Sequence, residues 1–380
     1  MLLDYPTLRI IWWLLLGTLL IGFAVMDGFD LGIGMLLHYV ARNNNERRVT
    51  LNTIGPVWEG NQIWLVLGAG AIFAAWPTLY AVSFSGFYLA MLAVLASLII
   101  RPVGFKYRSK IDNVAWRMLW DIGLFIAGFV PALVFGVALG NVLQGVPFYF
   151  DPMMRAFYTG TFWGLLNPFA LLCGLVSVFM LVMHGGVFLS IKTTGDIQKR
   201  AKSAAIIAAI ITLILFAACG YIVMYYIKGY QLASSLAHDG PSNPLYKHVV
   251  MQTGAWMNNL YAYHKLLIAH ACAFGGIIFT ILFISFNCNK IAWVTSALSI
   301  AGIIATVGVS MFPFILPSSS NPNMSLTVWD ASSSQLTLFI MLIATIIFLP
   351  IIILYTSWVY RVMRGKVTED YINQNQNNVY

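Results

Sequence analysis

Two carboxylates interrupt the segment FAVMDGFDLGIGM, residues 23–35, which is otherwise apolar enough to belong to a membrane-spanning helix. Asp27 and Asp30 are three positions apart, so on a helix their Cβ atoms lie about 5–6 Å from each other. Two full negative charges at that separation repel by roughly 3 kcal/mol at an effective dielectric constant near 20. The first two predicted helices place no Lys or Arg at this depth. We therefore expect the pair to share one exchangeable proton near neutral pH, as a proton relay requires.

Two more acids fall inside apolar segments, Glu59 in GPVWEGNQIW and Asp121 in WRMLWDIGLF. Counting from the predicted cytoplasmic ends of their helices at 1.5 Å per residue puts Asp30, Glu59 and Asp121 at roughly 9–12 Å, with Asp27 one turn deeper. The alternating helix directions therefore predict that acids from three helices meet at one level. Acids within the membrane favour a proton or cation pathway as the functional hypothesis.

The pair in the first helix also has a structural interpretation. Asp27 and Asp30 could simply hydrogen-bond the polar side chains of WEGNQ, namely Glu59, Asn61 and Gln62, and so hold two helices together. The residues alone leave this alternative open, although proton or cation handling is favoured.

Similar alternatives apply to the neighbouring positions. Arg117 precedes Asp121 by four residues and could form an ordinary helical ion pair with it, so that carrier and ion pair are equally favoured. Gly28 and Gly32 form a GxxxG pattern, which is typical of close helix approach. Trp58 is interpreted as a packing residue beside the polar set, with contact to lipid or quinone tails as the alternative.

The histidines and cysteines do not form a recognisable metal site. His184 is predicted near the inner end of the fifth helix, whereas His264 and His270 are predicted near the outer end of the seventh. They therefore lie at the wrong depths to bind one haem iron as an axial pair. The cysteines have neither CxxC spacing nor disulfide-framework spacing, so we expect inert packing residues: Cys173, Cys219, Cys272 and Cys288.

Composition places these residues in a polytopic membrane protein. Of the 380 residues, 60% are hydrophobic and only 9% are charged, and the mean hydropathy is +0.81, whereas about a quarter of residues are charged in soluble domains. We expect one all-α membrane domain over residues 1–380 without a separate soluble domain. Segments long enough to cross the bilayer predict about nine helices, near 9–38, 52–75, 78–101, 116–140, 162–190, 203–228, 262–286, 291–316 and 331–361.

The basic residues predict the orientation. With the N-terminus outside, 16 of the 21 Lys and Arg residues fall on the inner side, as the positive-inside rule requires. The C-terminal tail, 362–380, is then cytoplasmic, and the formal charge of +8 reflects topology rather than a nucleic-acid partner. We expect Asp330 to cap the N-terminus of the last helix.

Several long motifs, in order along nearly the whole chain, make the sequence recognisable. FAVMDGFDLGIGML, NTIGPVWEGNQIWLVLGAGAIFAAWP, GNVLQGVPF, MFPFILPSS and LTVWDASSSQLTL resemble subunit II of the cytochrome bd-type quinol oxidases. The resemblance implies two four-helix bundles, 9–140 and 160–316, plus one peripheral helix, 331–361. It also implies a place in the bacterial inner membrane beside a homologous subunit I, which carries two b-type haems and one d-type haem.

The function implied by this resemblance is aerobic respiration. The complex oxidises quinol, reduces O₂ to water and builds a proton gradient without pumping, while this chain stabilises subunit I and offers a cytoplasmic proton route. By motif, the carriers are Asp27, Asp30, Glu59 and Asp121. Familiar relatives have Asp at the WEGNQ acid, so Glu59 keeps a titratable group but places it one methylene further out. Quinol, membrane lipid and a small accessory subunit are the other partners implied.

A proton-coupled secondary transporter is the competing hypothesis, because it also needs acids within the membrane. Such proteins carry broken helices near the midplane in corresponding halves. Pro168, Pro313 and Pro317 lie near predicted outer ends instead, and the acids lie toward one side of the membrane. Both features disfavour a transporter.

Overall fold

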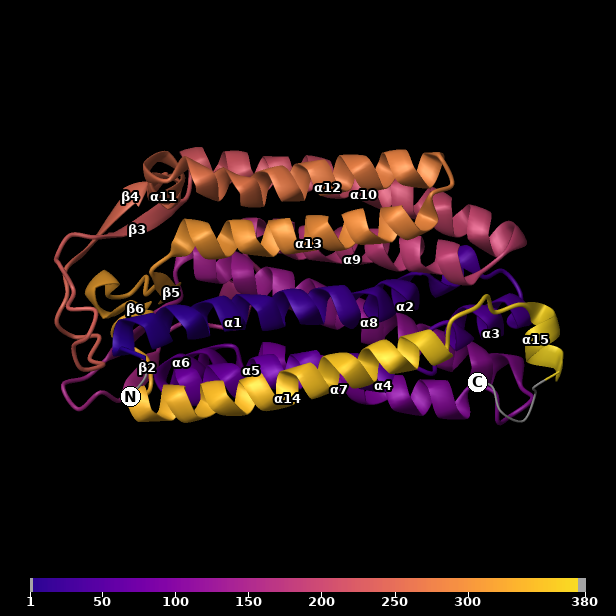
Figure 1. Cartoon of the computed structure of the whole chain (residues 1–380), viewed down its shortest axis with the longest axis horizontal. Coiled ribbons are helices and arrows are strands. Elements are labelled where there is room, and N and C mark those ends of the chain that lie inside the picture. The colour runs from indigo at the N-terminus through magenta and orange to yellow at the C-terminus, as the bar shows by residue number, and fades with distance from the viewer. Residues whose placement is uncertain (1–2, 375–380) are drawn as a thin grey trace.

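The structure is a computed structural model that describes residues 3–374. Long helices lie side by side along its long axis, with the N-terminus at one end and the short last helix at the other (Figure 1). The helices are α1 (Tyr5–Met26), α2 (Gly28–Val40), α3 (Asn44–Asn52), α4 (Trp58–Asn61), α5 (Ile63–Ala75), α6 (Pro77–Gly86), α7 (Tyr88–Tyr107), α8 (Val114–Gln144), α9 (Pro168–Lys192), α10 (Gly195–Tyr225), α11 (Asn258–Ala262), α12 (Leu267–Ser285), α13 (Asn289–Met311), α14 (Gln335–Val362) and α15 (Glu369–Gln374).

The predicted all-helical membrane architecture is confirmed. Within residues 3–374, eight helical segments are long and apolar enough to cross a membrane. A ninth crossing results if the bent pair Trp58–Ala75 and Pro77–Gly86, whose axes differ by 120°, is counted as one span. Proline favours the first turn of a helix and disfavours continuation of the preceding one, so the sharp bend occurs where α6 begins. This bend falls between the predicted second and third spans. The second, 52–75, is itself divided among α3, α4 and α5, and the third, 78–101, is divided between α6 and α7.

The first span is also interrupted, at Asp27. Together α1 and α2 form a 36-residue crossing, Tyr5–Val40, with the break between Met26 and Gly28. In a regular helix the Val25 carbonyl would accept from the N–H four residues later, but here it lies 3.0 Å from Nε2 of His184 in α9. A side chain that intrudes on the helical hydrogen-bond ladder is a recognised cause of such irregularity.

Glycines allow α2 to lie deep among its neighbours. A Cβ on Gly28 would lie 2.7 Å from Leu181 Cδ2, and one on Gly32 would overlap the Leu181 carbonyl oxygen. From the other side, a Cβ on Gly185 of α9 would lie 2.8 Å from the Gly32 carbonyl carbon. The GxxxG face of α2 therefore meets the α9 backbone directly, and this close packing fixes the depth of the carboxylates on α2.

Three antiparallel hairpins cover the end of the molecule that holds the N-terminus (Figure 1). Their strands are β1 (Phe148–Phe150) with β2 (Ala156–Tyr158), β3 (Lys228–Leu232) with β4 (Val249–Thr253), and β5 (Phe314–Leu316) with β6 (Leu326–Thr327). The connecting 3₁₀ turns are η1 (Trp163–Leu166), η2 (Ala255–Met257), η3 (His264–Leu266) and η4 (Pro322–Met324). The longest connection, near 229–261, is therefore partly ordered as a hairpin rather than only a turn-rich loop.

The prediction that Asp330 caps the last helix is wrong. Ser334 caps α14 instead, because its side chain accepts from the Thr337 N–H. Asp330 is 3% exposed, accepts from the Thr327 N–H at 2.8 Å and forms a 2.7 Å ion pair with the buried Lys247. Its carboxylate therefore ties the β3–β4 connection to the segment before α14.

Candidate functional site

A buried polar cluster contains Asp27, at the break between α1 and α2, and Asp30 of α2. Asp27 Oδ1 forms a 2.7 Å ion pair with Arg101 Nη1 of α7, and Asp30 Oδ2 accepts a 2.7 Å hydrogen bond from Asn61 Nδ2 of α4. Asn61 Oδ1 in turn accepts from the Tyr360 hydroxyl of α14 at 2.8 Å. The four side chains apart from Tyr360 are each at most 3% exposed. Four helices, α2, α4, α7 and α14, and the junction between α1 and α2 therefore contribute to one polar cluster in an apolar bundle.

Arg101 overturns the expectation that the acidic pair has no cation nearby. The prediction considered only the first two helices, and it placed Arg101 with the basic residues of an inner-side connection. In the structure α7 continues to Tyr107, so Arg101 lies more than a turn inside the helix and is 3% exposed. The missed signal is the arginine within SLIIRPVGF, an apolar stretch that continues on both sides of it.

One arginine does not balance two carboxylates. With both acids ionised, the set Asp27, Asp30 and Arg101 has a net charge of −1, whereas one added proton makes it neutral. Burial of an uncompensated charge is costly. Asp27 Oδ2 and Asp30 Oδ1 are buried without a hydrogen-bond partner among the described residues, so the cluster has acceptor atoms available for a proton or water. Its geometry suits the holding of one proton.

The other members of WEGNQ take different positions. Trp58 is buried and stacks on Phe105, with ring centroids 5.5 Å apart, and the Arg101 guanidinium lies 6.0 Å from its ring. It is therefore a packing residue in this fold. Gln62 is half-buried and Glu59 is exposed, so the hydrogen bond from this motif to the acidic pair comes from Asn61.

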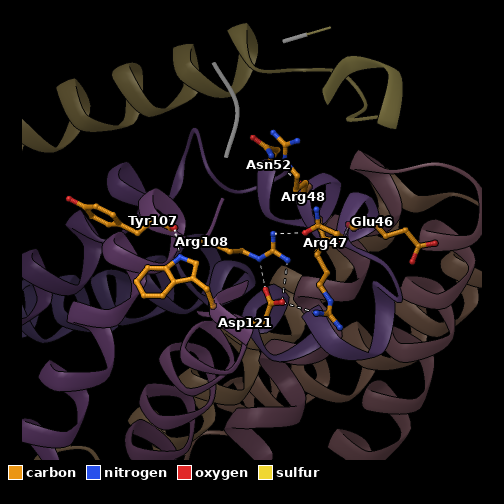
Figure 2. Close-up of polar contacts among 10 residues, drawn as sticks. Glu46, Arg47, Arg48, Asn52, Tyr107, Arg108 and Asp121 are labelled. Atoms are coloured by element: carbon orange, nitrogen blue, oxygen red, sulfur yellow. Dashed lines mark hydrogen bonds and ion pairs between the residues drawn. The ribbon is translucent and has the colours of Figure 1, made fainter. Parts of the chain in front are cut away.

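Asp121 belongs to a second charged cluster, at the end of the molecule near α3 (Figure 2). Its carboxylate accepts hydrogen bonds from Arg108 Nε at 2.5 Å and Arg108 Nη2 at 3.2 Å, and from Arg47 Nη1 of α3 at 2.8 Å. Arg117 pairs instead with the exposed Asp112. The alternative in which Asp121 pairs with Arg117 is therefore wrong, since Arg47 and Arg108 compensate this carboxylate.

The acids do not meet at one level. Gly128 of α8 packs so closely against the Leu31 carbonyl of α2 that a Cβ there would overlap it. The level of Asp30 therefore corresponds to the region of Gly128, and Asp121, seven residues earlier in α8, lies about 10 Å closer to the α3 end. The predicted depths were measured from the end of each helix, as if all helices ended at one level, but α8 extends past the end of α2.

His184 does not fit the role of a haem ligand. It is fully buried, with Nδ1 2.7 Å from Ser296 Oγ and Nε2 3.0 Å from the Val25 carbonyl oxygen. An axial imidazole needs one free ring nitrogen, and both nitrogens are engaged by protein atoms. Within residues 3–374 no group of three or more His, Cys, Asp or Glu side chains is arranged to hold a metal ion.

Comparison with known proteins finds clear relatives. Residues 8–363 match the family described as cytochrome bd terminal oxidase subunit II. The chain is 51% identical over 380 residues to cytochrome bd-I ubiquinol oxidase subunit 2 of Escherichia coli K12, covering 99% of this chain and all of the relative. It is 32% identical over 368 residues to cytochrome bd ubiquinol oxidase subunit 2 of Bacillus subtilis, covering 95% and 97%.

A solved structure has the same fold. A chain of the bd oxidase from Geobacillus thermodenitrificans superposes with a TM-score of 0.70 over 94% of this chain and 98% of that chain, at 17% sequence identity. At that identity the likeness concerns the fold.

Proposed function

Because the chain belongs to the cytochrome bd terminal oxidase subunit II family, we propose that it supplies a cytoplasmic proton inlet to the complex and stabilises subunit I. The chain is a subunit of a quinol oxidase, an oxidoreductase complex of the bacterial inner membrane that transfers electrons from quinol to O₂. This membership implies a subunit I partner and haems in the complex, and it replaces the transporter alternative.

The buried cluster of Asp27, Asp30 and Arg101 carries the proposal. It is neutral only with one proton bound, and we assign that proton to Asp30, because Asp27 already has the arginine whereas Asp30 has only the neutral amide of Asn61. An acid that is neutral by protonation in a low-dielectric environment can release and regain its proton as the local charge changes. Such an acid is suited to relay protons consumed by O₂ reduction.

Glu59 and Asp121 would serve this route in different ways. Glu59 lies two residues from Asn61 and is exposed on the surface of this chain, so it can exchange protons with water or with a partner surface. Asp121 is compensated by two guanidinium groups and needs no proton for neutrality. We therefore assign proton exchange to Glu59, and to Asp121 an electrostatic anchoring role at the cytoplasmic end of the route.

The arrangement of the complex follows from the same proposal. The haems, two b-type and one d-type, would be bound by subunit I, in agreement with the engaged imidazole of His184. Only 11% of the 18-residue apolar stretch of the last helix, α14, is buried within this chain. This exposure suits a peripheral helix beside two four-helix bundles, in contact with subunit I or lipid. The N-terminus would face the periplasm and the C-terminus the cytoplasm, and scalar proton uptake would build the gradient without pumping.

Turnover of the purified complex tests the inlet. Because Asp30→Asn and Glu59→Gln each remove a titratable group with little change in shape, each should reduce quinol-dependent O₂ consumption about tenfold or more and leave the visible haem spectrum intact. Asp196→Asn is the matched control, since Asp196 is an exposed acid near the same membrane face that pairs with the exposed Lys199. Unchanged O₂ consumption in both test variants would return these acids to the structural interpretation.

A further inference from the structure

A small basic cavity opens beside the Asp121 cluster. It has a volume of about 150 Å³, enough for several water molecules or one phosphate-sized group. Four arginines line it, namely Arg42 after α2, Arg47 of α3, Arg108 after α7 and Arg117 of α8. Figure 2 shows two of these guanidinium groups converging where α3 meets the ends of α7 and α8.

The acids around this cavity do not balance its arginines. Asp121 and Asp112 supply two negative charges against the four arginines that line it. Burial is the largest cause of the lowered pKa of the neighbouring Arg48, and repulsion from Arg108 and Arg117 lowers it further. Arg47 Nε is also buried without a hydrogen-bond partner among the described residues. The cavity therefore offers donors and net positive charge to an anion.

Another acid, Glu46, precedes Arg47 on α3 and is already engaged elsewhere. Its carboxylate pairs with Arg200 at 2.8 Å and accepts from the Arg42 N–H at 2.6 Å. Burial is the largest single influence and raises its pKa, but these contacts together outweigh burial and lower the pKa of Glu46 below its ordinary value. Its charge is therefore stabilised by its own partners and does not offset the excess in the cavity.

An apolar strip leads away from the cavity along α8. Val114 and Met118 line the cavity itself, and Val114, Met118 and Ile122, spaced four residues apart, are 75%, 51% and 45% exposed. Side chains four apart share one helix face, so this strip runs from the cavity toward the middle of the span. A charged cavity at the membrane surface, followed by an exposed apolar helix face, matches a phospholipid, which has a charged headgroup followed by an apolar acyl chain.

We propose that this cavity, lined by Arg42, Arg47, Arg108 and Arg117, binds the phosphate headgroup of an anionic phospholipid whose acyl chain lies along α8. Basic pockets between transmembrane helices on the cytoplasmic side are suited to anionic headgroups. Arginine donates paired hydrogen bonds to phosphate oxygens. A free phosphate ion would satisfy the arginines but would leave the apolar strip without a role.

Lipid binding to the purified complex tests the proposal directly. Phosphatidylglycerol and phosphatidylcholine are titrated separately in detergent, and bound lipid is counted by native mass spectrometry, with the haem spectrum as the check of assembly. The test variant combines Arg42→Gln with Arg117→Gln, which spares the two arginines that hold Asp121. Arg364→Gln is the matched control, because Arg364 is an exposed arginine outside the cavity.

The wild type should bind phosphatidylglycerol more tightly than phosphatidylcholine, and the double variant should lose at least tenfold in phosphatidylglycerol affinity, while Arg364→Gln keeps it. The charge-preserving pair Arg42→Lys and Arg117→Lys should keep most of the affinity, which separates charge from misfolding. Equal binding of the two lipids by the wild type, or an unchanged preference in the double variant, would overturn the proposal. If inorganic phosphate binds and is lost in the double variant while the two lipids bind equally, the site is a free-phosphate site instead.

Discussion

Replacement of Asp27 or Asp30 by asparagine should have very unequal effects on stability, although the two residues lie one turn apart. Asp27→Asn removes the partner of Arg101, whose guanidinium is 2.7 Å from the Asp27 carboxylate and 4% exposed. Asp30→Asn removes a carboxyl group that we assign as protonated, and the asparagine is close to it in shape. The first change leaves a buried charge unpaired, and the second leaves the charge balance of the cluster as it was.

The size of the difference follows from these contacts. Breaking a buried ion pair by removal of one partner costs about 3–5 kcal/mol, whereas loss of one neutral hydrogen bond costs about 1 kcal/mol. An unfolding entropy of about 2.1 cal/mol/K per residue gives about 0.8 kcal/mol/K for the 380 residues. Asp27→Asn should therefore lower the unfolding midpoint by at least about 4–6 °C, because helices retained in the micelle reduce that entropy. The shift for Asp30→Asn should be about 1 °C.

The assay is thermal unfolding of the purified complex at neutral pH, with wild type and both variants in the same detergent. The double variant Asp27→Asn with Arg101→Gln should recover most of the stability lost by Asp27→Asn alone, because it removes both buried charges. Equal losses for the two single variants, or a larger loss for Asp30→Asn, would refute the assignment of the proton to Asp30.

Three further predictions concern other parts of the chain. Gly32→Ala should lower the free energy of unfolding by about 1–3 kcal/mol, because its Cβ would overlap the α9 backbone; Gly17→Ala, with no atom within 4 Å of the added Cβ, should be neutral or slightly stabilising in the same unfolding assay. The pKa of Glu46 is lowered in the folded state. Its contribution to stability is therefore present above about pH 4–5 and is lost as the pH falls through the folded pKa. Glu46→Gln should flatten the fall of the unfolding midpoint below about pH 5, and an unchanged slope of midpoint against pH would contradict this role. Asp330→Asn leaves a buried lysine without its ion-pair partner and should lower the free energy of unfolding by about 3–5 kcal/mol. Protease cleavage in the hairpin region should then be faster, whereas cleavage at the wild-type rate would show that the ion pair does not hold the loop.

The sequence was sufficient for the membrane architecture because each crossing needs about 20 apolar residues, and that pattern is local. It also placed Gly28 and Gly32 on a face suited to close packing, where they meet α9. The interruption before Pro77 falls between two predicted spans, 52–75 and 78–101, but the break at Phe87 between α6 and α7 and the break at Asp27 were missed. At Asp27 the break coincides with the contact between His184 and the Val25 carbonyl oxygen. His184 is far away in the chain, so no local sequence pattern predicts this break.

Only part of the candidate site was predicted, because contacts between helices are not visible in a local sequence pattern. Acids within apolar segments are visible in the sequence, but the cations that balance them come from other helices. Arg101 lies in α7, and Arg108 directly follows this helix, about two turns further along. Arg101 forms an ion pair with Asp27, whereas Arg108 forms one with Asp121. Depth counts from helix ends could not separate these two levels, because α8 starts beyond the end of α2 and only packing shows the offset.

The hydrogen bond between Tyr360 and Asn61 has a consequence for biogenesis. Asn61 is made early and Tyr360 near the end of translation, since the two residues are 299 positions apart. Until α14 is inserted, Asn61 can bind Asp30 but lacks its own donor, so the polar cluster is complete only after the last span has entered the bilayer. A chain cut short before α14 would present an unfinished polar surface inside the membrane, which quality-control proteases could recognise before assembly with a partner subunit.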